Sequence, residues 1–276
     1  MKNQFAVFGN PIKHSLSPQI HQNFAEQHGH HISYEKLLST ETDFTKDVKH
    51  FFDRGGDGCN VTVPFKEQAF SLCTYLTDAA SRAQSVNTLY QSESGEFHGH
   101  NTDGAGLLSD LVNNLKIGLK RKHIIIIGAG GATRGILQPL IEQAPSGITL
   151  INRTLSKAET LAREFQDLFD ITPAGNDSKP PSTAPDLLIN ATSASLSSQL
   201  PISDTGFIGK QTVCYDLAYA KKPTLFLQWS KDCGCCQSHD GRGMLVEQAA
   251  LAYTTWTGCK VSTENILKNF TQIEAG

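Results

Sequence analysis

The sequence has no membrane-length apolar run and no strong excess of one charge. Its most apolar segments, such as residues 124–127, are as long as a strand, whereas a membrane-spanning helix needs about 20 apolar residues. The 24 Lys and Arg residues nearly balance the 27 Asp and Glu residues, and the formal charge is −3. We therefore predict that the protein binds neither membrane nor nucleic acid.

A disulfide framework and a secretory signal are also missing. The first residues enter a strand-like pattern directly, without a basic region, an apolar stretch or a small-residue cleavage site, so we expect a cytoplasmic protein. The seven cysteines are an odd number, and four of them lie in apolar stretches where a thiol packs as a small hydrophobe. These four, which we expect to be reduced, are Cys59, Cys73, Cys214 and Cys259.

One short cysteine cluster, Cys233-Gly234-Cys235-Cys236, invites a zinc interpretation, with His239 as the nearest further ligand. Structural zinc sites usually pair such a segment with a second Cys or His pair elsewhere, and the sequence offers none. We therefore favour a surface loop with incidental thiols and predict no metal site.

Apolar, β-prone segments alternate with amphipathic segments along the chain. With 276 residues, of which 39% are hydrophobic and 18% charged, the chain can bury two medium-sized cores. Such alternation is typical of α/β folds, in which helices cover a mostly parallel sheet. The first series predicts strands at 5–8, 32–37 and 59–63, helices at 18–27, 42–52 and 64–72, a hairpin at 86–90 and 95–98, and a helix at 103–115.

A second alternating series starts at residue 123 and indicates a separate nucleotide-type fold. It predicts strands at 123–127, 148–152, 187–191 and 213–217 and helices ending near 143 and at 156–169, with a proline-rich exposed loop at 176–185. Two amphipathic patterns, 244–256 and 263–270, need the first domain to bury their apolar faces. We predict an α/β protein of two domains: residues 1–103, completed by 243–276, with a mostly parallel sheet, and a Rossmann-like domain at 104–242.

Residues 124–135, IIIIGAGGATRG, read as a buried strand that runs into a glycine turn and then a helix. Glycines let the backbone approach a pyrophosphate, which is bound by the N–H groups of the helix N-terminus. Thr133 replaces the third glycine of the usual dinucleotide pattern, and a purely structural turn is the alternative. The context of strand, turn and helix favours dinucleotide binding.

The residues that follow the next predicted strand indicate which nicotinamide cofactor is bound. NAD-binding folds place an Asp or Glu about 20 residues after the turn, on the ribose 2′-hydroxyl. Here the strand ends in Asn152-Arg153-Thr154, followed by Lys157, and no carboxylate is present. A guanidinium group binds phosphate through paired hydrogen bonds, so we predict NADP(H), with Arg153 as a merely solvated residue the alternative.

Short polar side chains gather where strands of the first domain are predicted to end. Open α/β sheets bind ligands at this edge, and uncharged hydroxyls and amides suit a ligand that carries hydroxyls itself. Each residue also has a structural explanation: Ser17 or Asp103 could cap a helix, and Asn60 could serve a turn. Together with one lysine and a nucleotide fold, they favour a ligand site within segments 10–18, 60–66, 85–88 and 101–104.

Nine motifs, in order and spacing over nearly the whole chain, resemble those of shikimate dehydrogenases. They are GNP (9–11) with SLSP (15–18), NVTVPFK (60–66), VNT (86–88), NTDG (101–104), GAGGA (128–132), NRT (152–154), NATS (190–193), YDLAY (215–219) and GRGML (241–245). The resemblance implies NADPH-dependent reduction of 3-dehydroshikimate to shikimate, a step of aromatic amino-acid biosynthesis, in a deep cleft between two α/β domains.

The resemblance also implies roles for individual residues. Lys66 and Asp103 would be catalytic, with Lys66 assisting proton transfer and Asp103 orienting its ammonium group. The substrate carboxylate would be held by Ser15, Ser17 and Tyr219, and its ring hydroxyls and reacting oxygen by Thr62, Lys66, Asn87, Asp103 and Gln248. The cofactor would be held by Asp78, Gly128, Ala129, Gly130, Gly131, Ala132, Asn152, Arg153, Thr154, Lys157, Thr192, Leu217 and Gly241.

Two alternatives remain at this point. The related quinate/shikimate dehydrogenases have relaxed cofactor use, more often accept NAD and present an acidic residue near the turn that carries Asn152-Arg153-Thr154 in this chain. A non-catalytic sensor of a quinate-like ligand would not need Lys66 and Asp103, and the chain carries no DNA-binding module. By analogy with the family we also expect a homodimer.

Overall fold

The chain divides into two compact units in the computed structural model, which describes residues 3–179, 183–197, 199–202 and 204–274. Residues 1–106 and 245–276 form the first unit, and residues 107–244 form the second. Both crossings between the units fall inside helices, α5 (Asp103–Ser109) and α9 (Arg242–Thr257). The predicted fold class, an α/β protein with two mostly parallel sheets, is confirmed.

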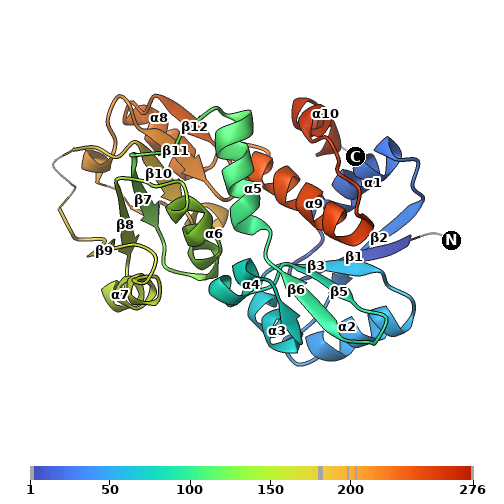
Figure 1. The fold of residues 1–276 in the computed structure, drawn as a ribbon. Coiled ribbons are helices and arrows are strands. Elements are labelled where there is room, and N and C mark those ends of the chain that lie inside the picture. Colours follow the sequence, from blue (N-terminus) through green and yellow to red (C-terminus); the bar gives the residue numbers. More distant parts are fainter. Residues whose placement is uncertain (1–2, 180–182, 198, 203, 275–276) are drawn as a thin grey trace. The chain divides into compact units, whose positions relative to one another are not determined.

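The first unit is built on a mixed sheet. Its strands in the described residues are β1 (Asn3–Gly9), β2 (Ile32–Leu38), β3 (Gly58–Val61), β4 (Tyr75–Leu76), β5 (Thr88–Gln91) and β6 (Phe97–His100), in the order β2-β1-β3-β5-β6-β4 (Figure 1). Strand β1 is parallel to β2 and β3, whereas β5 is antiparallel to β3 and β6. The predicted hairpin is therefore confirmed as β5 and β6, with Thr88 opposite His100.

Helices cover both faces of this sheet. They are α1 (Ser17–Gln27), α2 (Phe44–Asp53), α3 (Lys66–Leu72), α4 (Asp78–Ala83), α10 (Glu264–Lys268) and α11 (Phe270–Ile273), together with parts of α5 and α9. Because side chains alternate along a strand, Phe8 of β1 packs with residues of α2 and α3, while Phe5 packs with residues of α1 and α9. Helices α2 and α3 lie on the other side of the sheet from α1 and α9 (Figure 1). The C-terminal helices bury Tyr253 and Phe270 in this second cluster, so their apolar faces pack on β1 and α1.

The second unit has a sheet in which all described pairs of neighbouring strands are parallel. Its strands are β7 (His123–Ile127), β8 (Gly147–Asn152), β9 (Ile171–Gly175), β10 (Leu187–Asn190), β11 (Val213–Asp216) and β12 (Gln237–His239), in the order β12-β11-β10-β7-β8-β9. The order reverses after β7, as in dinucleotide-binding folds. Central strand β7 is apolar throughout residues 124–127 because both of its faces are buried.

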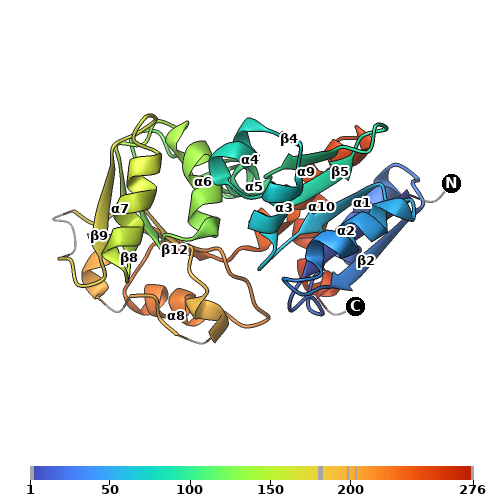
Figure 2. The same ribbon diagram turned by 90° about the horizontal axis from the view of Figure 1, so that it is seen from below.

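The helices of the second unit are α6 (Gly131–Ile141), α7 (Leu155–Glu164) and α8 (Leu225–Asp232), with a π-helical turn at Asp110–Asn114 and 3-10 turns at Ala194–Ser197 and Thr205–Phe207. Ile124 and Ile126 pack with residues of α6 and α7, and Ile125 and Ile127 pack with residues of α8. Helix α8 lies on the other side of this sheet from α7 (Figure 2). Helix α7 ends at Glu164, five residues before the predicted end at 169, and the buried Phe165 is its C-cap.

The strands that the sequence pattern missed are β4, β9 and β12. Strands β4 and β12 have two and three residues, and all three lie at sheet edges. Pro173 lies inside β9, which is tolerated because an edge strand does not need every N–H. Within the predicted loop, residues 176–179 and 183–185 form neither helix nor strand, and 180–182 lie outside the described residues. In the described parts of the chain, every helix is too short or too polar to cross a membrane.

Candidate active site

An ion pair joins the first residues of two helices in the first unit. Nζ of Lys66, at the start of α3, lies 2.5 Å from Oδ2 of Asp103, at the start of α5. The side chains are only 27% and 13% exposed, so water screens the pair less than it would on the surface. The prediction that helix α3 starts at Pro64 is wrong: Phe65 is the N-cap, and Pro64 belongs to the preceding turn.

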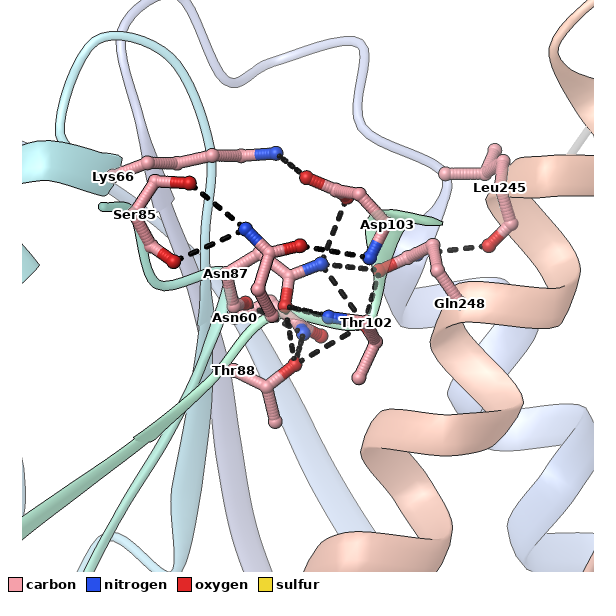
Figure 3. A network of polar contacts seen from close by, with 10 residues as sticks. Asn60, Lys66, Ser85, Asn87, Thr88, Thr102, Asp103, Leu245 and Gln248 are labelled. Carbon is pink, nitrogen blue, oxygen red and sulfur yellow. Dashed lines mark hydrogen bonds and ion pairs between the residues drawn. The ribbon is translucent and has the colours of Figure 1, made fainter. Parts of the chain in front are cut away.

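Asn87 fixes the second oxygen of the Asp103 carboxylate. Its Nδ2 donates to Oδ1 of Asp103 at 2.8 Å, while its Oδ1 accepts from the backbone N–H of Thr102 at 2.9 Å (Figure 3). A backbone N–H can only donate, so it determines which end of the Asn87 amide faces Asp103. The other carboxylate oxygen of Asp103 is thereby directed to Lys66.

Hydroxyl and amide groups beneath Asn87 complete a buried network. The Thr88 hydroxyl donates to Oδ1 of Asn87 at 2.9 Å, and Nδ2 of Asn60 donates to the carbonyl of Asn87 at 3.0 Å (Figure 3). Asn60 lies inside β3 and is 6% exposed, so it does not form the turn considered as an alternative. Sequence reasoning assigned no role to Thr88 or Thr102, both fully buried, although each lies inside a quoted motif.

Gln248 approaches the network from helix α9. Its Oε1 accepts from Nδ2 of Asn87 at 3.3 Å and from the Thr102 hydroxyl at 3.4 Å, and its Nε2 donates to the carbonyl of Leu245 (Figure 3). The close approach depends on Gly106 of α5, where a Cβ atom would lie 2.7 Å from Cβ of Gln248. Residues 146 and 161 positions apart in the chain therefore meet in one site.

The two predicted serines lie where α1 begins. The Ser15 hydroxyl donates to Oγ of Ser17 at 3.1 Å, and the Ser17 backbone N–H donates back to Oγ of Ser15. Leu16 occupies the N-cap position, so Ser17 does not cap the helix. Thr62 follows β3 and is partly exposed, and its backbone N–H donates to the carbonyl of Phe8. Tyr219 belongs to the second unit.

Beside Ser17, a buried group was missed by sequence reasoning. His21, one helical turn further along α1, is fully buried, and its ring is stacked 4.6 Å from that of Tyr34. The Tyr34 hydroxyl donates to Oδ1 of Asn60 at 2.7 Å, which links α1 to the network under Asn87. Burial lowers the pKa of His21 to about 3, so the imidazole is neutral at physiological pH. The only sequence signal for His21 is its spacing of four residues from Ser17, which places both residues on one face of α1.

In the second unit, the glycine turn has the shape that its sequence predicts. Gly128 has φ +109°, and a Cβ atom there would lie 2.9 Å from the Thr192 side chain. A Cβ atom on Gly130 or Gly131 would meet nothing within 4 Å, so the space above the N-terminus of α6 is open. Thr133, the departure from the glycine pattern, is buried and donates its hydroxyl to the carbonyl of Gly128 at 2.7 Å.

Asn152 connects this turn with the basic segment after β8. Its Oδ1 accepts from the backbone N–H of Ala129 at 3.1 Å, and its Nδ2 donates to the carbonyl of Thr154 at 2.9 Å. Arg153, Thr154 and Lys157 are exposed beside it. Asp78, the one acidic residue among the predicted cofactor residues, is exposed at the start of α4 and belongs to the first unit.

A buried carboxylate organises the carboxyl ends of β10 and β11. Asp216 is fully buried and accepts from the hydroxyls of Ser195 and Thr224, each at 2.6 Å, and from Nδ2 of Asn190 at 3.0 Å. Desolvation raises the pKa of Asp216, and these hydrogen bonds oppose the rise. Three predicted cofactor residues lie nearby: Thr192 donates to Asn190, Leu217 follows Asp216, and Gly241 packs against Leu217.

Three family models match consecutive parts of the chain. They describe a shikimate dehydrogenase substrate binding domain (residues 7–89), a shikimate / quinate 5-dehydrogenase (110–200) and a shikimate 5'-dehydrogenase C-terminal domain (241–268). Over 266 residues, the chain is 46% identical to the shikimate dehydrogenase (NADP(+)) of Vibrio cholerae, with 96% of this chain and 95% of that protein covered. The chain belongs to the shikimate dehydrogenase family.

Two further family members support the assignment. The shikimate dehydrogenase (NADP(+)) of Vesicomyosocius okutanii is 47% identical over 267 residues, with 96% of this chain and 98% of that protein covered. A crystal structure of shikimate 5-dehydrogenase from Thermus thermophilus, in complex with NADP(H) and shikimate, matches with a TM-score of 0.86 and 31% identity, covering 98% of this chain and 99% of that one. The resemblance drawn from nine motifs is thus confirmed at the level of the family.

In the protein described here, the residues of the second unit fit a phosphorylated dinucleotide. The open space above Gly130 and Gly131 leaves room for phosphate oxygens at a helix N-terminus that no side chain caps. One strand along, Arg153 and Lys157 supply cations, and neither residue is neighboured by a carboxylate in the segment 152–157. The donor set therefore matches a second phosphate group better than a free 2′-hydroxyl.

The cysteine cluster of this chain belongs neither to the glycine turn nor to the basic segment after β8. Cys233–Cys236 connect α8 to β12, and Cys235 packs against the apolar cluster under α8. All seven cysteines are free. Within the described ranges, the structure brings together no group of three or more His, Cys, Asp or Glu side chains that could hold a metal ion.

Proposed function

We propose that this protein catalyses the reversible NADP-dependent reduction of 3-dehydroshikimate to shikimate. The observation that carries the proposal is the Lys66–Asp103 pair at 2.5 Å, held by the Asn87 amide inside a network of neutral donors and acceptors. The 46% identity to a shikimate dehydrogenase (NADP(+)) supports the choice of substrate and cofactor.

Reduction of a ketone places negative charge on the carbonyl oxygen as the hydride arrives. When bound, NADPH supplies that hydride. The Lys66 ammonium donates a proton to this oxygen, and in the reverse direction its amine accepts the proton from the hydroxyl. Asp103 holds the ammonium in place for this proton transfer. Asn87 keeps the Asp103 carboxylate from rotating away.

The neutral donors around this pair suit the rest of shikimate. We assign Thr62, Asn87 and Gln248 to the ring hydroxyls and the Ser15 and Ser17 hydroxyls to the carboxylate, to which Tyr219 adds a third hydroxyl. A carboxylate bound by hydroxyls alone is held less strongly than one bound by arginine, which favours release of the product. Each of these residues lies at the position of this chain that corresponds to a substrate-binding residue of the family.

On the cofactor side, we assign the pyrophosphate to the backbone of residues 128–132 and the 2′-phosphate to Arg153, Thr154 and Lys157. Asn152 contributes by holding the glycine turn against this basic segment, through its bonds to Ala129 and Thr154. Thr192, Leu217 and Gly241 line the carboxyl ends of β10 and β11, where this fold class binds the nicotinamide half. Asp78 is included on the resemblance alone.

A four-way assay tests the proposal. Purified protein is mixed with shikimate or quinate and with NADP or NAD, and the absorbance of the reduced cofactor is followed. We expect the highest kcat/KM for shikimate with NADP. A preference for quinate or for NAD would replace the proposal with a quinate/shikimate dehydrogenase, and binding of shikimate without turnover would replace it with a ligand sensor.

The cytoplasmic location and the homodimer stay predictions. Light scattering during gel filtration, over a 100-fold range of protein concentration, distinguishes one chain from two. A mass of one 30.0 kDa chain throughout would contradict the dimer. Fractionation of cells that express the tagged protein tests the compartment.

A further inference from the structure

The loop between β11 and α8, residues 217–224, carries two of the assigned residues, Leu217 and Tyr219. It is anchored at both ends. The Leu217 N–H donates to the carbonyl of Asn190 at 2.9 Å, and the Thr224 hydroxyl donates to Asp216 at 2.6 Å. Between these anchors, residues 220–223 are exposed and include Lys221 and Lys222. Burial of apolar surface therefore cannot hold the middle of the loop.

The segment that opens α9 holds the backbone on both sides of Tyr219. The Gly241 N–H donates to the carbonyl of Ala218 at 3.2 Å, and Nη2 of Arg242 donates to the carbonyl of Ala220 at 2.7 Å. Gly241 permits this approach, because a Cβ atom there would lie 2.1 Å from the carbonyl oxygen of Leu217. The carbonyl groups of the residues before and after Tyr219, Ala218 and Ala220, are thus both held by adjacent residues.

Asp240 orients the arginine that makes the second of these contacts. Its Oδ1 accepts from the Arg242 backbone N–H at 3.2 Å, and its Oδ2 lies 3.5 Å from Nε of Arg242. The two side chains are 27% and 20% exposed, for Arg242 and Asp240 respectively. The ion pair at Nε restricts the directions in which the rest of the planar guanidinium can point, and here Nη2 points to the carbonyl of Ala220.

We propose that Arg242, oriented by Asp240, is a positioning residue that holds Tyr219 ready for the substrate carboxylate. The inference rests on the proposed function, in which Tyr219 is a substrate residue. A loop that is already ordered loses less entropy when substrate binds, so the contact lowers the KM for shikimate without entering the chemical step. Arg242 acts through the backbone and touches neither the transferred hydride nor the proton.

Arg242→Met tests the proposal, because methionine keeps much of the side-chain length and removes the donors. We expect faster hydrogen exchange at amides of residues 219–222, while Leu217 stays anchored to Asn190. The KM for shikimate should rise about 10-fold, because one charge-assisted hydrogen bond is lost. The kcat and the KM for NADP should change by less than about twofold. Arg242→Lys, which retains a charged donor, should have a KM for shikimate close to that of the wild type. Arg163→Met, at an exposed position of α7, is the matched control, and its loop exchange and kinetic constants should equal those of the wild type.

A double-mutant cycle with Tyr219→Phe shows whether Arg242 acts through the tyrosine. If it does, Arg242→Met raises KM much less in the Tyr219→Phe background than in wild type. Effects on KM that simply multiply would overturn the proposal, as would unchanged loop exchange in Arg242→Met. If that variant fails to fold, Asp240→Asn replaces it and should raise the exchange rate and KM in the same direction by a smaller factor.

The two proposals fail in different ways. Absence of shikimate oxidation by the wild-type protein would remove the proposed function, while the exchange measurement would still test the hold of Arg242 on the loop. Normal wild-type activity together with wild-type exchange and KM in Arg242→Met would remove this inference alone.

Discussion

Lys66 and Asp103 are far apart in the chain, and each is the first residue of its helix. Their separation of 2.5 Å depends on Asn87, whose amide is oriented by the Thr102 backbone N–H. The sequence motifs pointed to all three residues. The orientation of Asn87, and with it the division of the Asp103 oxygens between Asn87 and Lys66, required the fold, because no local spacing specifies which residue lies opposite Thr102.

At this scale, Lys66→Ala should lower kcat by about 10²–10⁴ and change the KM for shikimate far less, because the lysine stabilises charge that develops only in the transition state. Initial rates over a range of shikimate and NADP concentrations measure both constants. Lys122→Ala, at an exposed lysine paired with Asp186 in the second unit, serves as the control. A raised KM at unchanged kcat would make Lys66 a binding residue only.

Arg153→Ala should weaken NADP selectively. Loss of a charge-assisted contact to the 2′-phosphate predicts a KM for NADP raised about 10- to 100-fold, with the KM for NAD nearly unchanged. Steady-state kinetics with the two cofactors check this, and Arg163→Ala on α7 is the control. Equal weakening of both cofactors would instead place Arg153 outside the phosphate site.

At the scale of elements, the strands in the middle of each sheet were predictable, and the strands at the edges were not. Strand β7 is apolar on both faces because helices cover both, and this makes its sequence unmistakable. Strands β4, β9 and β12 lie at sheet edges, where short length and a residue such as Pro173 are tolerated. Their local sequences carry little β signal, so the rest of the sheet decides their conformation.

The glycine turn before α6 gives an element-scale prediction with a matched pair of variants. Gly131→Val adds a side chain in open space, so the free energy of unfolding should change by less than about 0.5 kcal/mol. The isopropyl group should still raise the KM for NADP more than about 10-fold, because it occupies the space of a phosphate oxygen. Urea unfolding and steady-state kinetics measure the two effects.

Gly128→Ala should behave in the opposite way. Its φ of +109° and the Thr192 side chain at 2.9 Å leave no room for a Cβ atom, so we expect destabilisation by about 1–3 kcal/mol. Gly131→Val with an unchanged KM for NADP would show that no phosphate lies above the turn.

Across the whole molecule, the dependence of stability on pH includes a contribution from His21. The pKa is about 3 in the folded protein and 6.5 in the unfolded chain, so between these values the unfolded state binds more protons. Stability is therefore lost as the pH falls below 6.5, by about 1.4 kcal/mol per pH unit. Asp216, whose pKa is raised by burial, acts in the opposite direction near its own titration.

His21→Leu should remove the first of these effects. Urea unfolding of the first unit, followed by the fluorescence of Trp256 beside residue 21, is measured at pH 7 and pH 5. We expect wild type to lose about 2 kcal/mol more than the variant between these values. His50→Leu, at an exposed site on α2, should lose as much as wild type. Equal losses in wild type and His21→Leu would contradict burial of a neutral imidazole.

The sequence by itself determined the alternation of strands and helices, the glycine turn, the basic segment in place of an acid, and the family. Each of these is written in neighbouring residues, where spacing and side-chain chemistry act directly. The tertiary structure alone decided which groups meet: His21 against Tyr34, Thr88 beneath Asn87, and Arg242 on the carbonyl of Ala220. Such contacts form only when the sheets fix distant segments side by side, because hydrogen bonds require distances and directions that sequence spacing does not contain.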